Sequence, residues 1–143
     1  MTPVPDDVRI DAGVLRLEDP AATADAIAEA MRRAARDFRR RGGVLGLSGG
    51  IDSSVVAALA ARAFGPERVL GVLMPESDSS PDTLRLSRLA ADAVGIETVV
   101  EDITPALQAV GCYQRRDDAI RKVLPDYGEG WKAKIVLPSV VES

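Results

Sequence analysis

The chain has 143 residues, with 46 % hydrophobic and 28 % charged side chains, which suits one compact folded domain and argues against a disordered chain. Its formal net charge is −4, so the surface as a whole does not attract nucleic acid, and any anion site must be local. Histidine is absent and Cys112 is the single cysteine, which excludes a Ser-His-Asp or Cys-His catalytic group, histidine-ligated zinc and an internal disulfide.

The first residues, MTPVPDDVRI, place acids where a secretory signal has bases, and no apolar run approaches the roughly 20 residues that cross a bilayer. We therefore expect a cytoplasmic protein with no membrane partner. Residues 1–18 should be irregular, apart from a short strand at VLRL.

A long helix is predicted to begin at Pro20, with Asp19 as its N-cap, and to end before Gly42 and Gly43. Apolar residues recur in it at spacings of three and four, which indicates a single buried stripe. This stripe consists of Ile27, Met31, Ala34 and Phe38. The arginines of RRAARDFRRRGG suit a solvated last turn better than a patch for a polyanion.

Three apolar runs then alternate with two helical patterns. The runs are VLGL, RVLGVLM and IETVVED, and the helices are expected from Asp52 to Phe64 and over residues 83–94. This alternation predicts an α/β fold, an open parallel sheet with helices on both faces. The apolar faces comprise Val55, Leu59 and Ala63 in the first helix, and Leu86, Leu89, Ala90 and Ala93 in the second.

Beyond Pro105 the pattern weakens. LQAVGCYQRRDDAIRKVL should be helical in part, and PDYGEGWKAK should form a loop. The apolar end, IVLPSVVES, fits either a fourth strand or an element that continues beyond Ser143, so we expect the chain to be the front part of something larger. Cys112 is interpreted as a packed apolar residue rather than a nucleophile. Solvated surface, rather than contact with a substrate anion, is expected for Arg115, Arg116, Lys132 and Lys134.

The stretch LGLSGGIDSS lies where the first predicted strand ends and the next helix begins. Unpaired N–H groups at a helix start, flexible glycines and serine hydroxyls together predict a phosphate site at the carboxyl edge of the sheet. Asp52 would repel phosphate unless it holds Mg²⁺. The alternative is a tight turn in which Asp52 or Ser53 only caps the helix. A Walker A loop is excluded, because no lysine follows Gly50.

The run SGGIDSS resembles the pyrophosphate-binding loop S-G-G-x-D-S of the ATP pyrophosphatases. Within that group the chain looks most like the NAD⁺ synthetases over residues 25–105. The segments that support this are GVLGLSGGIDSSVVAALAARAFG, VLGVLMPESDSSPDTLRLSRLAADAVGI and VVEDITP. The resemblance implies a Rossmann-like fold of the adenine nucleotide alpha hydrolase type, and residues 1–143 as a single, incomplete ATP-binding domain in which residues 106–143 are the least certain part.

The resemblance also implies a role for each matching position. The β,γ-pyrophosphate of ATP would contact Ser48, Gly49, Gly50, Asp52, Ser53 and Ser54. Asp52 would be a Mg²⁺ ligand. The adenosine would lie against Gly46, Leu47, Leu73 and Met74. Ser79 and Ser80 would lie near the nucleotide, although on composition alone they are capping residues.

The activity that the resemblance implies is amide formation. ATP adenylates deamido-NAD⁺, ammonia displaces AMP, and the enzyme is a homodimer that needs Mg²⁺ and no catalytic side-chain nucleophile. Two alternatives stay open at this point: a related ATP pyrophosphatase that acts on another carboxylate, and an inactive nucleotide-binding fragment.

Overall fold

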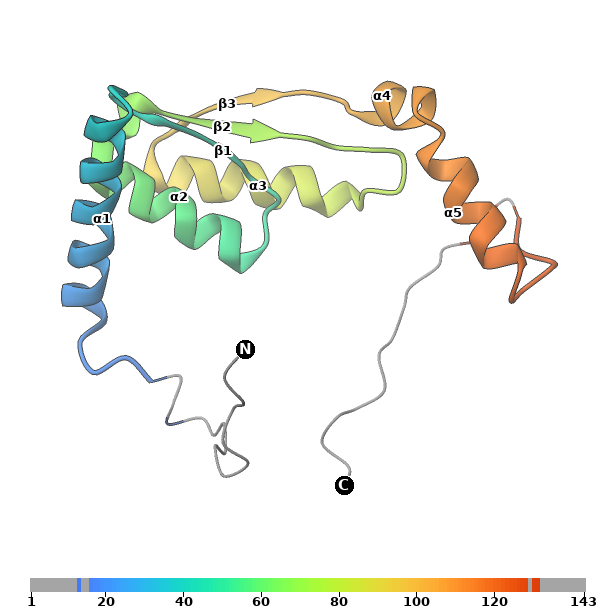
Figure 1. Cartoon of the computed structure of the whole chain (residues 1–143), viewed down its shortest axis with the longest axis horizontal. Coiled ribbons are helices and arrows are strands. Elements are labelled where there is room, and N and C mark those ends of the chain that lie inside the picture. Colours follow the sequence, from blue (N-terminus) through green and yellow to red (C-terminus); the bar gives the residue numbers. More distant parts are fainter. Residues whose placement is uncertain (1–12, 14–15, 129, 132–143) are drawn as a thin grey trace.

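The computed structural model describes residues 13, 16–128 and 130–131, and Figure 1 shows their arrangement. A short sheet is followed by two helices that extend away from its carboxyl edge. The elements are α1 (Pro20–Asp37), β1 (Gly43–Gly46), α2 (Ile51–Phe64), the 3₁₀ turn η1 (Pro66–Arg68), β2 (Val69–Leu73), α3 (Pro81–Val94), β3 (Glu97–Val100), α4 (Thr104–Ala109) and α5 (Cys112–Arg121).

The sheet has three parallel strands in the order β1-β2-β3, and its register aligns Leu45 with Gly71 and Gly71 with Thr98. The predicted α/β fold with a parallel sheet is therefore confirmed. Adjacent parallel strands joined by right-handed crossovers place both connecting helices on one side, and α2 and α3 indeed lie on the same side in Figure 1. Helices on the second face are not among the elements described, and Val44 on that face is 70 % exposed.

The core between helices and sheet is built mainly from small residues. Its buried members are Leu47, Ala57, Ala60, Val69, Ala91 and Ile96. Protein interiors are densely packed, so the distance between a helix and a sheet depends on the size of the side chains between them. Small side chains therefore let the helices lie close to the sheet. The core is therefore a thin apolar layer directly behind the loop that follows β1.

The predicted helix faces need correction. In α2 Ala63 is buried as predicted, but its buried companions are Ala57 and Ala60, whereas Val55 is 51 % exposed. In α3 the buried residues are Ser87 and Ala91, and Leu89 is 60 % exposed. The large apolar side chains mislead here because alanines, which weigh little in a hydrophobic pattern, face the sheet.

The first helix begins as predicted, with Asp19 as its N-cap accepting a hydrogen bond from the Ala22 N–H at 2.9 Å. It ends at Asp37, before the predicted glycines. Ala28 is its buried residue, and Phe38, placed in the stripe by its spacing, is exposed beyond the helix end.

The region after β3 is helical in part, as expected, and forms α4 and α5. The proposed fourth strand at IVLPSVVES lies outside the described residues, as do most of residues 1–18, including part of VLRL. In the described ranges, every helix is too short or too polar to cross a bilayer.

Candidate functional site

The glycine loop lies between the end of β1 and the start of α2, as the sequence predicts. Leu47 continues the direction of the strand, and its N–H donates to the Val72 carbonyl at 3.0 Å. The chain then leaves the sheet at Ser48, and α2 begins at Ile51 with Gly50 as its N-cap. The loop therefore lies at the carboxyl edge of the sheet, where open α/β folds bind ligands.

Gly49 is a glycine because of the fold. Its φ is +76°, in the left-handed region that side chains disfavour, and an added Cβ would lie 2.8 Å from the Leu86 Cβ and 2.9 Å from the Ser87 backbone nitrogen. The loop and α3 thus approach so closely here that no side chain fits between them.

Gly50 does not have this constraint. Its φ is −78°, and an added Cβ would meet only the Ser48 hydroxyl oxygen, at 3.4 Å. The folded chain by itself has no need of glycine at this position. The absence of a side chain at Gly50 instead keeps the outer surface of the loop open.

The serines of the loop bond to one another and to its backbone. The Ser53 hydroxyl accepts from the Ser48 N–H at 3.2 Å and donates to the Gly50 carbonyl at 3.0 Å. The Ser48 and Ser53 hydroxyl oxygens lie 3.1 Å apart, and the Ser54 hydroxyl donates to the Gly50 carbonyl at 2.8 Å. These bonds fix the shape of the loop before any ligand arrives.

The capping alternative is wrong for this loop, because the N-cap of α2 is Gly50 and no side chain caps the helix. The first N–H groups of a helix have no carbonyl partner within it. At Ile51, Asp52 and Ser53 these groups form the positive end of the α2 dipole.

Asp52 lies in the first turn of α2 and is exposed. Within the described ranges, no group of three or more His, Cys, Asp or Glu side chains could together hold a metal ion. Asp52 is therefore not part of a ligand cluster of that size in this part of the chain.

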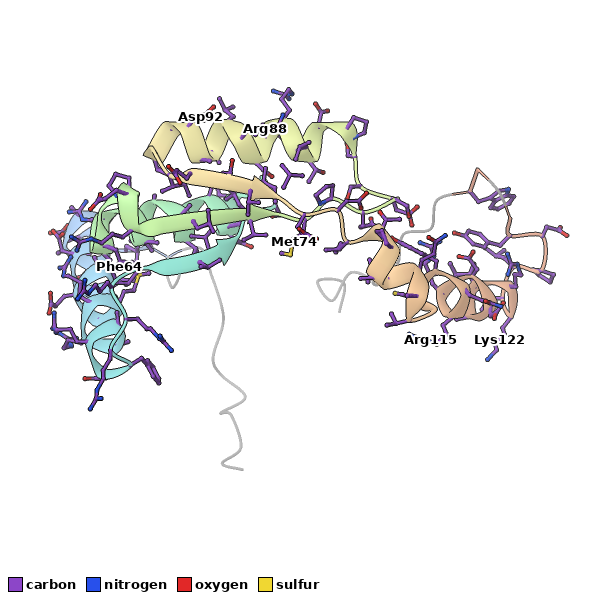
Figure 2. The ribbon with its side chains drawn as sticks, turned by 90° about the horizontal axis from the view of Figure 1, so that it is seen from above. Phe64, Met74, Arg88, Asp92, Arg115 and Lys122 are labelled. Atoms are coloured by element: carbon purple, nitrogen blue, oxygen red, sulfur yellow. The ribbon has the colours of Figure 1, made fainter. Side chains whose placement is uncertain are left out.

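A cavity of about 350 Å³ opens beside the loop. Its walls come from the ends of β1 and β2 and from α3 with the loop that precedes it. They comprise Gly46, Leu47, Ser48, Val72, Leu73, Met74, Pro75, Ser79, Thr83, Leu84 and Ser87. The four positions expected beside adenosine thus line one cavity. Met74 is 48 % exposed, so it is not a core residue, and Figure 2 shows it at the carboxyl end of β2, where the chain leaves the sheet.

Ser87, which no motif of the sequence predicts as a site residue, joins α3 to the loop. Ser87 is 1 % exposed, and its hydroxyl oxygen lies 3.0 Å from the Leu47 carbonyl oxygen and 2.8 Å from that of Thr83. The sequence feature that could have indicated its burial is its helical spacing from Leu84 and Ala91, which lie three residues before it and four residues after it.

Ser79 and Ser80, the last two residues of the β2–α3 loop (residues 74–80), differ in role. Ser80 is the N-cap of α3 and accepts from the Asp82 N–H at 3.3 Å, as composition alone predicts. Ser79 lines the cavity, and its hydroxyl accepts from the Glu76 N–H at 3.0 Å.

The cations of α5 lie away from the cavity. Arg116 pairs with Asp78 and Asp117, and the hydrogen bond to Asp117 is the main reason that the pKa of its guanidinium is raised. Arg115 is exposed and Cys112 is half-buried. Lys132 and Lys134 lie outside the described residues.

Similarity to known proteins shows to which family this chain is related. The family model of NAD synthase matches residues 23–124. The chain is 57 % identical over 124 residues to the NH(3)-dependent NAD(+) synthetase of Rhizobium meliloti (strain 1021), covering 87 % of this chain and 37 % of that protein. The chain therefore spans well under half the length of that curated relative.

Two solved structures share the fold. The NH3-dependent NAD synthetase from Campylobacter jejuni, in complex with nitrate, superposes with a TM-score of 0.60 at 27 % identity, over 76 % of this chain and 52 % of that one. A glutamine-dependent NAD⁺ synthetase from Acinetobacter baumannii, in complex with ADP, gives a TM-score of 0.62 at 26 % identity, over 79 % and 20 %.

Proposed function

The chain belongs to the NAD synthase family, and on that basis we propose that it supplies the ATP-binding part of an enzyme that makes NAD⁺ from deamido-NAD⁺, ATP and ammonia. The whole protein would adenylate the nicotinate carboxylate and then aminate it, releasing pyrophosphate and AMP. Cytoplasmic location and a homodimer belong to the same proposal.

One observation supports ATP binding most directly: the anion-compatible loop and the apolar cavity adjoin. Free N–H groups at the start of α2 suit phosphate oxygens, and the bare Gly50 lets them approach the backbone. Met74 offers exposed apolar surface for an adenine ring a short distance along the same edge, and the nearly buried Leu47 and Leu73 line the same cavity behind it. We assign the triphosphate tail to the loop, with Ser48, Ser53 and Ser54 shaping it.

Asp52 is chemically suited to Mg²⁺, because hard cations prefer carboxylate oxygens and this carboxylate is exposed at the loop. Bound there, Mg²⁺ would neutralise charge on the phosphates. Because the described residues contain no cluster of three or more such ligands, phosphate oxygens and water would supply most of the remaining coordination.

The proposed reaction needs no protein nucleophile. A carboxylate oxygen of deamido-NAD⁺ attacks the α-phosphorus, the bond from phosphorus to the bridging oxygen breaks, and pyrophosphate leaves with the electron pair. The loop amides stabilise the charge that grows on the leaving group. Ammonia then attacks the adenylate carbonyl, AMP departs, and the nitrogen loses a proton.

The test is product formation by the protein at its full natural length. We expect NAD⁺, AMP and pyrophosphate in equal amounts from deamido-NAD⁺, ATP, Mg²⁺ and ammonia. If AMP forms only with a different carboxylic acid, that acid takes the place of deamido-NAD⁺ as the acceptor in this proposal. ATP binding without AMP formation would reduce it to a nucleotide-binding role, and absence of ATP binding would refute it.

A further inference from the structure

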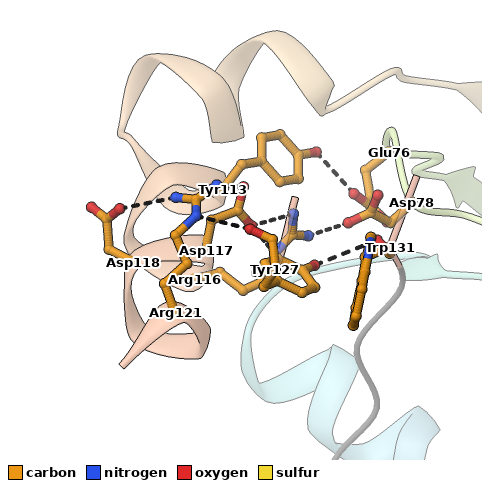
Figure 3. A network of polar contacts seen from close by, with 9 residues as sticks. All are labelled: Glu76, Asp78, Tyr113, Arg116, Asp117, Asp118, Arg121, Tyr127 and Trp131. Atoms are coloured by element: carbon orange, nitrogen blue, oxygen red, sulfur yellow. Dashed lines mark hydrogen bonds and ion pairs between the residues drawn. The ribbon is translucent and has the colours of Figure 1, made fainter. Parts of the chain in front are cut away.

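The β2–α3 loop has two sides. On its inner side Met74, Pro75 and Ser79 line the cavity. On its outer side Glu76 and Asp78 face α5, as Figure 3 shows. The Ser79 N–H donates to the Glu76 carbonyl at 2.9 Å, so movement of Glu76 is passed on to Ser79.

Two side chains from α5 hold the outer side of this loop. The Tyr113 hydroxyl donates to Glu76 Oε2 at 2.9 Å, and Arg116 forms an ion pair with Asp78. The Arg116 guanidinium carbon also lies 5.3 Å from the centre of the Tyr113 ring, a cation–π distance. Tyr113 and Arg116 are three residues apart on a helix and therefore lie on the same face.

A third contact fixes Arg116 itself. Its Nε donates to Asp117 Oδ1 at 2.9 Å, and Asp117 also pairs with Arg121, so the guanidinium is held from two directions. None of the residues of α5 is buried, so apolar packing does not define where this helix sits. The polar contacts of Tyr113 and Arg116 define it instead.

Part-exposed ion pairs stabilise proteins weakly, so global stability does not account for this arrangement. Its geometric effect is specific, since it restrains the segment that forms one wall of the cavity. We propose that Tyr113 and Arg116 are positioning residues that hold the β2–α3 loop in the shape that receives the adenosine of ATP. This inference rests on the function proposed above.

The test compares Arg116→Gln and Tyr113→Phe with Arg115→Gln, a matched neighbour on α5 whose guanidinium, within the described residues, bonds only to the Val110 carbonyl. We expect the first two variants to weaken ATP binding about three- to fivefold, as for loss of a part-exposed pair. In the full-length enzyme the KM for ATP should rise while kcat and the KM for deamido-NAD⁺ stay unchanged. Arg115→Gln should match the wild type.

Two further measurements separate positioning from mere stabilisation. Hydrogen exchange of the Glu76 and Ser79 amides should speed up in Arg116→Gln without ATP, with an unchanged melting temperature. The double variant Asp78→Asn with Arg116→Gln should bind ATP no more weakly than Arg116→Gln alone, because both changes break the same ion pair. Unchanged affinity in Arg116→Gln, or losses that add up in the double variant, overturns the inference alone. A wild-type chain that binds no ATP overturns the proposed function and this inference with it.

Discussion

Gly49 and Gly50 are adjacent in the chain but meet different constraints. Gly49 has a positive φ and touches the backbone of α3, whereas Gly50 has an ordinary conformation and space for a methyl group. The fold therefore accounts for the first glycine, whereas the second would be explained by access for the proposed ligand.

We expect Gly49→Ala to lower the free energy of unfolding by about 2 kcal/mol, since it combines an unfavourable φ with a backbone clash. Gly50→Ala should stay within about 0.5 kcal/mol of the wild type while losing ATP affinity. Urea denaturation and calorimetric titration with ATP measure the two effects. The opposite order of stabilities would contradict the assignment.

Asp52 is expected to act only when Mg²⁺ is present. Asp52→Asn should weaken Mg²⁺-dependent ATP binding at least about tenfold, as disturbed metal ligation does, and leave binding without Mg²⁺ unchanged or stronger. Asp82→Asn is a suitable control, because Asp82 opens α3 in the same way and pairs with Arg85. If ATP binding by Asp52→Asn depends on Mg²⁺ as it does in the wild type, Asp52 is not a Mg²⁺ ligand.

At the scale of elements, α3 is fastened to the glycine loop by one buried hydroxyl. Ser87→Ala would leave the Leu47 carbonyl without that partner, and we expect a loss of about 1–2 kcal/mol in the free energy of unfolding. Ser87→Thr keeps the hydroxyl and separates lost bonding from changed size. A Ser87→Ala variant as stable as the wild type would show that the bond does not matter.

The start of α4 carries a pH-dependent contact. Hydrogen bonds from the side chain and backbone of Thr104 lower the pKa of Asp102 below its ordinary value of 3.8. The contact thus contributes fully above that value and is lost as pH falls through the lowered pKa. Carboxyl NMR titration should give a midpoint below 3.8 for Asp102. In Thr104→Ala the midpoint should move up toward 3.8, because the hydroxyl no longer donates to the carboxylate. The same midpoint in both proteins would show that the hydroxyl does not lower this pKa.

The order of elements and the glycine loop could be predicted from the sequence because both depend on local features: short apolar runs, caps and a distinctive glycine–serine string. The helix faces could not, because α2 buries alanines and exposes Val55. The link from Arg116 to Asp78 joins residues 38 positions apart, and no local pattern signals it.

For the molecule as a whole, the described elements leave the sheet face opposite α2 and α3 uncovered, and that face is largely apolar. Val44 and Val99 are both exposed on it. We expect the 143-residue chain to enhance the fluorescence of an apolar dye such as ANS, and Val44→Glu with Val99→Glu to reduce that signal. A signal that the double variant leaves unchanged would place the dye elsewhere.

The alanines on the sheet-facing side of α2 determine the distance between this helix and the sheet. Ala57 and Ala60 touch no part of the cavity, yet their small size determines how near the helix axis lies to the strands. A larger residue there would push the helix outward, and the amides at its first turn would rise with it. The spacing between the two layers thus sets where the proposed phosphate site lies relative to the sheet, so we expect substitutions deep in the core to alter nucleotide affinity without any contact with nucleotide.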